Sequence, residues 1–122
     1  LCKTNGHMID ITGTNVTIMA KDMDVAINFY ESIGLNLQNR WGDHYAMMTT
    51  TGITIGIHPA NQETDLTSGS VSIGFMPDSL EEAKELLHKN NIAFKIDDGK
   101  SGAYLHFKDP DGTVLYFVKP KW

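Results

Sequence analysis

Apolar and polar side chains alternate along several short stretches of the chain, which is the pattern of β-strands with one buried face. The clearest examples are Ile53–Ile57, with three isoleucines, and Ala103–Phe107, which alternates apolar residues with tyrosine and histidine. The same pattern predicts strands over Val16–Met19, Tyr45–Thr49, Ile53–His58, Val71–Phe75, Ala93–Ile96, Ala103–Lys108 and Val114–Val118.

Two other stretches repeat apolar side chains at the spacing of an amphipathic helix. The first begins at Asp22 or Asp24, either of which can cap a helix, and Gly34 ends it. The second begins at Ser79 and follows the capping-box pattern. In that pattern Ser79 accepts a hydrogen bond from a free backbone N–H, and Glu82 reaches back to the start of the helix.

The two halves of the chain repeat each other. Asn15–Ile18 aligns with Ser72–Phe75, and Gly52–Ile57 aligns with Gly112–Phe117. Each half contains a strand, a helix and then about three strands, which indicates an α+β fold of two tandem βαβββ modules. Within one domain, we expect an N-terminal extension over 1–12, a first module over 13–58, a linker over 59–69 and a second module over 70–122.

The opposite faces of these strands carry small, polar and aromatic side chains. Such a surface does not resemble a packed core, and it is typical of the lining of a concave ligand pocket. Trp41, in the expected loop Gln38–His44, either closes this pocket by stacking on a planar ligand or is an exposed or interface tryptophan. The side chains expected to line the pocket are Asn15, Tyr45, Met47, His58, Ser72, Tyr104, His106 and Tyr116.

Charge limits the classes of partner. The chain has 10 Lys and Arg against 15 Asp and Glu, a formal net charge of -5. An acidic protein repels phosphate backbones, so we expect no nucleic-acid partner and favour a neutral or cationic small ligand. The acidic residues in the linker and in the expected loop Asp97–Gly102 are solvated charges or, at the rim of the pocket, would attract a cation; they are Glu63, Asp65, Asp97 and Asp98.

Cysteine content and hydropathy bear on location. Cys2 is the single cysteine, so an internal disulfide and a CxxC metal clip are excluded, and a reducing cytoplasm fits. The apolar runs are too short to span a bilayer, and no signal-peptide pattern is found, so we expect a cytoplasmic protein without a membrane partner.

Two motifs stand within this order of elements. One is the helix sequence Ala26-Ile27-Asn28-Phe29-Tyr30 before Gly34-Leu35, and the other is the run Phe107–Thr113, which contains Asp-Pro-Asp-Gly. Together with the repeated order of elements, they resemble the vicinal oxygen chelate superfamily, which includes glyoxalase I, extradiol dioxygenases, and fosfomycin and bleomycin resistance proteins. The resemblance implies a curved, cup-like mixed sheet with helices on its outer face, and a homodimer.

The resemblance also implies where a metal ion would bind, because each half of the metal-using members supplies two ligands. The matching positions are Asn15 and Gly56 in the first half, and Ser72 and Tyr116 in the second. None is a histidine or a carboxylate, whereas a metal site commonly needs three or four such ligands. We therefore expect no metal and no other cofactor.

Asp109 and Asp111 could be taken for a general acid–base pair. Their setting in Asp-Pro-Asp-Gly favours turn chemistry instead, in which an aspartate bonds to its own backbone.

The leading hypothesis is a metal-independent protein that sequesters a partly aromatic, possibly cationic compound, as bleomycin resistance proteins sequester an antibiotic. Two alternatives stay open. One is a lyase, isomerase or dioxygenase-like enzyme of the same fold, with His106 or Tyr116 in proton transfer or a metal bound by other residues. The other is a domain for assembly or regulation without a ligand.

Overall fold

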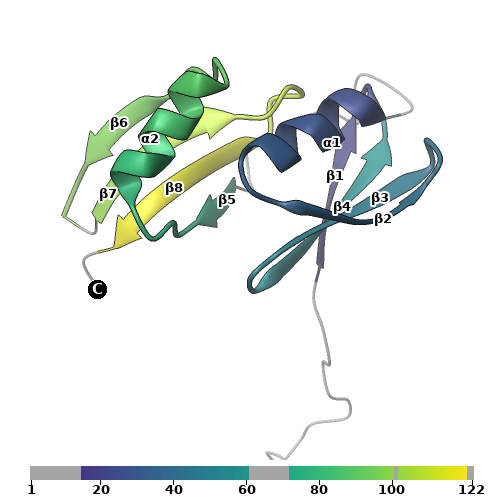
Figure 1. Ribbon diagram of the computed structural model, residues 1–122, viewed down its shortest axis with the longest axis horizontal. Helices are drawn as coiled ribbons and strands as arrows, with labels where there is room; N and C mark the ends of the chain where they lie inside the picture. The colour runs from purple at the N-terminus through teal and green to yellow at the C-terminus, as the bar shows by residue number, and fades with distance from the viewer. Residues whose placement is uncertain (1–14, 61–71, 101, 121–122) are drawn as a thin grey trace, which may run out of the picture.

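The computed structural model describes residues 15–60, 72–100 and 102–120. The proposed extension 1–12, most of the proposed linker, Cys2, Glu63 and Asp65 lie outside the described residues. Two modules follow each other along the chain (Figure 1). Their elements are β1 (Asn15–Ala20), α1 (Met23–Ser32), β2 (Asn36–Trp41), β3 (Tyr45–Thr50), β4 (Ile53–Pro59), β5 (Ser72–Phe75), α2 (Leu80–Lys89), β6 (Lys95–Asp98), β7 (Gly102–Lys108) and β8 (Val114–Pro120).

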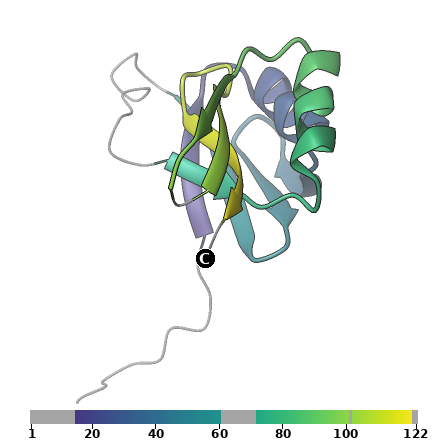
Figure 2. The same ribbon diagram turned by 90° about the vertical axis from the view of Figure 1, so that its left-hand side faces the viewer.

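The strands form two open sheets of four strands each. Sheet A has the order β1-β4-β3-β2, and sheet B has the equivalent order β5-β8-β7-β6. In each sheet the first strand pairs in parallel with the last, and the remaining pairs are antiparallel. The α+β fold of two tandem βαβββ modules is therefore confirmed, with the expected mixed sheet divided into two. In Figure 2 both helices lie on one side of the two sheets.

The helix ends follow their local sequence. Asp22, rather than Asp24, caps α1, and its side chain accepts a hydrogen bond from the Val25 N–H at 3.1 Å. Ser79 caps α2 and accepts a hydrogen bond from the Glu82 N–H at 3.2 Å. Neither helix in the described part of the chain is long and apolar enough to span a bilayer.

Two segments that we expected to be loops contain edge strands. The expected loop Gln38–His44 is wrong in its first part, because β2 continues to Trp41. The strand expected at Ala93–Ile96 begins instead at Lys95 and includes Asp97 and Asp98, which we assigned to a loop. Every residue of β2 and β6 is exposed. Neither strand has a buried face, so its sequence lacks the alternation on which the prediction depends.

One hydrophobic core extends through both modules. The isoleucines of β4 and the alternate residues of β7 and β8 point into it, as the strand pattern predicted. Phe29 of α1 reaches Phe107 of β7 with 6.4 Å between ring centroids, and Phe107 lies 5.2 Å from Phe117. The first helix therefore packs against strands of the second module as well as against its own sheet.

A buried hydrogen bond joins the modules at the same place. The Tyr30 hydroxyl of α1, on a fully buried side chain, donates to Asp109 Oδ2 at 2.7 Å. The other oxygen, Oδ1, accepts hydrogen bonds from the backbone N–H groups of Asp111 at 2.9 Å and Thr113 at 2.8 Å. The turn chemistry expected for Asp109 is thus present, and the same carboxylate also anchors the first helix.

A second contact of this turn reaches the first module. The Lys21 N–H donates to Asp111 Oδ1 at 3.2 Å. Partial burial raises the pKa of the Asp111 carboxyl above its usual range, and the hydrogen bond from Lys21 opposes that shift. Both aspartates of the Asp-Pro-Asp-Gly turn therefore link the modules.

Replacing Tyr30 with phenylalanine tests the junction between the modules, by which we mean the contact of Tyr30 with the Asp109 turn. We expect Tyr30→Phe to lower the free energy of unfolding at pH 7 by about 1.5–3 kcal/mol, because a buried carboxylate loses a hydrogen bond. Burial, and then the charge of Asp109, raise the pKa of Tyr30. Its stabilisation is therefore complete below the unfolded-state pKa of about 10 and is lost as the pH rises above it.

Urea unfolding at pH 7 and at a series of alkaline pH values measures the free energy of unfolding of both proteins. The difference between the wild type and Tyr30→Phe should shrink by up to about 1.4 kcal/mol per pH unit above about pH 10. Tyr116→Phe is the matched control, since its side chain is half-buried on an open sheet face, and it should change stability by less than about 0.5 kcal/mol. Equal stability of the wild type and Tyr30→Phe at pH 7 would show that the bond does not hold the junction.

Candidate functional site

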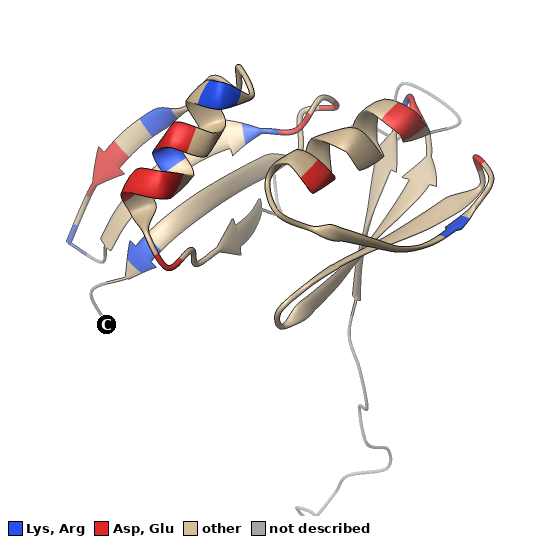
Figure 3. Ribbon diagram, viewed as in Figure 1, with Lys and Arg blue, Asp and Glu red and all other residues tan. Residues whose placement is uncertain are grey.

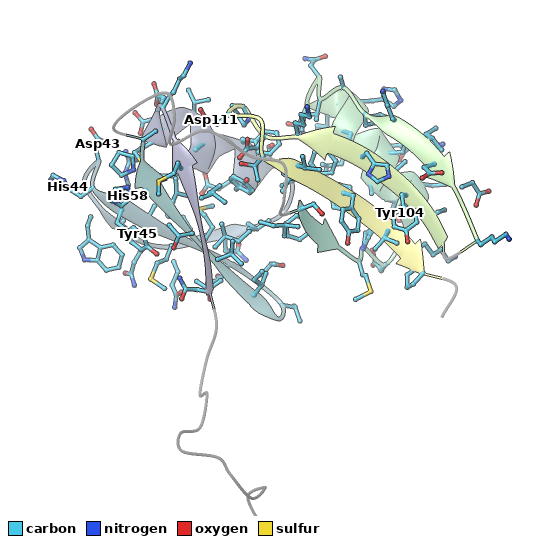
Figure 4. The ribbon with its side chains drawn as sticks, turned by 180° about the vertical axis from the view of Figure 1, so that it is seen from behind. Asp43, His44, Tyr45, His58, Tyr104 and Asp111 are labelled. Carbon is cyan, nitrogen blue, oxygen red and sulfur yellow. The ribbon has the colours of Figure 1, made fainter. Side chains whose placement is uncertain are left out.

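The predicted pocket residues come from strands of both sheets, and the three that Figure 4 labels, Tyr45, His58 and Tyr104, lie on the open faces, away from the helices. The structure divides them between the modules. Sheet A carries Asn15, Trp41, Tyr45, Met47 and His58, and sheet B carries Ser72, Tyr104, His106 and Tyr116.

Three of these side chains form an aromatic cluster on sheet B. The rings of Tyr104 and His106, both on β7, are stacked with 5.6 Å between centroids and 11° between planes. The Tyr116 ring, on β8, lies 5.7 Å from Tyr104 and 5.9 Å from His106. All three side chains are half-buried, so the cluster is packed on one side and open on the other. We call these three residues the aromatic cluster.

A glycine makes room for the aromatic cluster. Gly74 of β5 is the register partner of Tyr116 on β8. A Cβ at Gly74 would overlap the Tyr116 ring, so this ring lies directly over the glycine backbone. A residue without a side chain is what such a close approach requires.

Sheet A has a smaller aromatic pair. The Tyr45 hydroxyl lies over Gly56 of β4, where a Cβ would overlap it. The Tyr45 ring is 5.9 Å from that of Trp41, the last residue of β2, which is 50% exposed. Met47, next along the same face of β3, is half-buried and is the register partner of Gly56.

The two histidines of the predicted pocket are on different sheets. His58 Nδ1 is 2.8 Å from the Pro59 carbonyl oxygen, and a hydrogen bond there places the proton on Nδ1 and leaves Nε2 as the acceptor. His106 Nε2 lies 3.8 Å from Asp97 Oδ2, with 43% and 64% of the two side chains exposed. An ion pair this long and this exposed contributes little, so Asp97 does not fix the orientation of the imidazole.

The positions implied for a metal do not suit one. Asn15 and Ser72 are exposed at the starts of β1 and β5 and supply neutral oxygen atoms, and Gly56 supplies no side chain. The Tyr45 hydroxyl occupies the space above Gly56, while the fourth position, Tyr116, covers Gly74 with its ring. Within residues 15–60, 72–100 and 102–120, no group of three or more His, Cys, Asp or Glu residues could hold a metal ion.

The aromatic cluster and the Trp41–Tyr45 pair do not meet within one chain. Tyr45 and Tyr104 are far apart in Figure 4, on the outer parts of different sheets. Two residues of the aromatic cluster, His106 of β7 and Tyr116 of β8, pair in register. The alternation of faces along the strands was enough to predict that they share one face. The separation of the two open faces depends instead on how the modules pack.

A cavity of about 750 Å³ lies elsewhere, and the sequence did not reveal it. It opens between α1, the loop after α2, the start of β6 and the turn between β7 and β8. His106 is the one predicted pocket residue on its wall. The other wall residues come from helix ends, a loop and a turn, where no periodic pattern marks a shared surface.

Solved structures of low sequence identity share this fold. A glyoxylase/bleomycin resistance protein/dioxygenase domain from Frankia sp. EAN1pec is 22% identical, with coverage of 92% of this chain and 100% of that chain and a TM-score of 0.71. The fosfomycin resistance protein FosX from Listeria monocytogenes is 16% identical, with coverage of 92% and 94% and a TM-score of 0.77. An integron cassette protein from V. cholerae is 20% identical, with coverage of 92% and 98% and a TM-score of 0.69.

The family comparison covers most of the chain. No curated protein matches the sequence. Residues 14–117 match the family model described as Glyoxalase/Bleomycin resistance protein/Dioxygenase superfamily. The Tyr30 helix, the Asp109 turn and every element except the end of β8 lie within the matched residues. The chain therefore belongs to the glyoxalase/bleomycin resistance protein/dioxygenase superfamily.

Proposed function

We propose that this protein binds a small, partly aromatic organic molecule and does so without a metal ion. The observation that carries the proposal is the aromatic cluster on sheet B. Its three rings are held by neighbouring strands and packed against one another, so they present a preformed surface on which a planar ligand can stack.

Polar groups around the aromatic cluster favour a neutral or cationic ligand. Ser72 and His106 can form hydrogen bonds with a ligand on the same face. The Asp97 carboxylate lies at the edge of that face, 3.8 Å from His106. A carboxylate at the edge attracts a cation and repels an anion, which agrees with the net charge of -5.

A homodimer would enclose the ligand. Within one chain the open faces of both sheets are turned the same way, so each covers one side of a ligand at most (Figure 4). If sheet A of a second copy faces sheet B, the Trp41–Tyr45 pair closes over the aromatic cluster. Two-fold symmetry then gives two equal sites, each with one sheet from each copy. His58, Met47 and Asn15 would complete the polar and apolar lining.

Sequestration of an antibiotic is one form that this binding would take. FosX is a fosfomycin resistance protein by its name, and the family name includes bleomycin resistance. Aromatic and cationic antibiotics are therefore the first compounds to screen by thermal shift, since a bound ligand raises the melting temperature.

Tyrosine substitutions test the stacking surface. For a ligand found in the screen, we expect Tyr104→Ala and Tyr116→Ala each to weaken binding by up to about tenfold, because stacking contributes about 0.5–1.5 kcal/mol per ring. Tyr104→Phe and Tyr116→Phe keep the rings and should bind within about twofold of the wild type if stacking dominates. Calorimetric titration measures both sets. Wild-type affinity in the two alanine variants would move the site away from the aromatic cluster.

Metal removal tests the second half of the proposal. The protein purified without chelator should contain metal well below one equivalent, because the matching positions offer no His or carboxylate. Dialysis against EDTA should leave the dissociation constant of the same ligand within about twofold. Stoichiometric zinc, iron, manganese or nickel in the protein, or loss of binding after EDTA that added metal restores, would contradict metal-free binding.

Mixing two variants tests the shared site. Tyr45→Ala and Tyr104→Ala should each bind weakly alone. After subunit exchange, a mixed dimer contains one site with both substitutions and one with neither. With equal amounts and random exchange, about a quarter of all sites should regain wild-type affinity. Titration of the mixture measures that fraction, and sedimentation confirms the dimer. No recovery in a dimer that exchanges subunits would show that Tyr45 and Tyr104 do not act in a site shared between two copies.

A further inference from the structure

The cavity beside α2 has the dimensions and walls of a ligand site. Its volume of about 750 Å³ falls within the roughly 300–1,000 Å³ of small-molecule sites. Its walls come from a loop, two strand ends and a helix of the other module, and His106 is the one wall residue that it shares with the aromatic cluster. Neither Tyr104 nor Tyr116 lines it.

The cavity has a largely apolar wall made of two groups of residues. In the first group, Phe29 of α1 and Phe107 of β7 are neighbours, and Phe107 is only 4% exposed. In the second group, Ile92 and Phe94 follow α2, and the Phe94 ring packs edge-on against His88 with 5.0 Å between centroids. The phenylalanines are held by neighbouring rings, so a flat ring can enter a space that already exists.

Charged groups on the wall favour an anion. Lys95 at the start of β6 and Lys108 at the end of β7 are both exposed and line the cavity. Basic segments on these strands are visible in Figure 3. Asp109 is the one carboxylate on the wall, and three hydrogen bonds from Tyr30 and its own turn occupy both its oxygens. Two cations against one engaged carboxylate leave the wall positive in a protein of net charge -5.

The nearby end of α2 does not reverse this preference. A helix C-terminus carries partial negative charge on its free carbonyl groups, which repels anions. Here the Leu86 carbonyl accepts from both the backbone and the side chain of Asn90, and the Leu87 carbonyl accepts from the Ile92 N–H. The His88 carbonyl accepts from the Asn91 N–H. These bonds leave the lysines as the main charges at the mouth of the cavity.

We infer that this cavity is a second binding site, which takes an aromatic carboxylate. The ring of the ligand enters between the phenylalanine walls, and its carboxylate group pairs with Lys95 and Lys108. This site prefers the charge opposite to the one favoured by the aromatic cluster. It shares only His106 with that cluster and needs no dimer, so it stands apart from the proposed function.

A matched pair of probes tests the charge preference. 2-Naphthoate and 2-naphthylmethylammonium present the same ring system with opposite charges. Calorimetric titration at low salt should show saturable binding of one naphthoate per chain, at least about tenfold tighter than the ammonium compound. Absence of naphthoate binding, or equal affinity for the two probes, would overturn the inference.

Substitutions locate the bound probe. Lys95→Glu combined with Lys108→Glu should weaken naphthoate binding by about tenfold or more, while Lys119→Glu, an exposed lysine of β8 off the cavity wall, should stay within about twofold. Ala93→Phe, at an exposed position on the wall, should weaken binding by obstructing the cavity without disturbing the core. Unchanged affinity in both cavity variants would reject this site.

Tyr104→Ala separates the two proposals. It removes a ring of the aromatic cluster and should leave naphthoate affinity within about twofold. Loss of naphthoate binding in this variant would place the probe on the open face and overturn the second site. Failure of naphthoate to bind while a screened ligand still requires Tyr104 would reject the second site alone.

Discussion

The buried carboxylate of Asp109 constrains the arrangement of both modules. A carboxylate with 6% exposure is costly unless hydrogen bonds replace its hydration. Its own turn supplies two backbone N–H groups, and the Tyr30 hydroxyl supplies the third donor. That donor is available only when α1 lies beside the end of β7, where Phe29 also meets Phe107. The need of the buried Asp109 carboxylate for this hydrogen bond thus fixes the position at which the apolar surfaces of the two modules join.

The junction has a direct effect on the candidate site. With α1 held against the second module, the two sheets lie side by side and their open faces do not close on each other (Figure 1). The aromatic cluster is left on sheet B and the Trp41–Tyr45 pair on sheet A. Each face can stack on one side of a planar ligand. An enclosed site on these faces would therefore need a second copy, whereas the cavity beside α2 is formed by one chain.

Sequence patterns predicted the fold where a face is buried and failed where none is. The alternation at Ile53–Ile57 and Ala103–Phe107 identified the core faces correctly, because burial selects every second residue. The fully exposed β2 and β6 show no such selection. The turn at Asp109 was predictable from local chemistry, but its partner Tyr30 is 79 positions away. No local signal specifies such a pairing, and the same is true of the cavity wall.

In each module a tyrosine packs over a glycine of a neighbouring strand, but the two modules place this pair on different strands. In the second module the tyrosine is on the last strand and the glycine on the first, as Tyr116 lies over Gly74. In the first module the last strand carries the glycine instead, and Tyr45 reaches over Gly56 from β3. The arrangement in the second module places Tyr116 opposite His106, and these two residues form the aromatic cluster with Tyr104. A repeated backbone therefore carries unequal faces, and in the proposed dimer each copy would contribute a different half of one site.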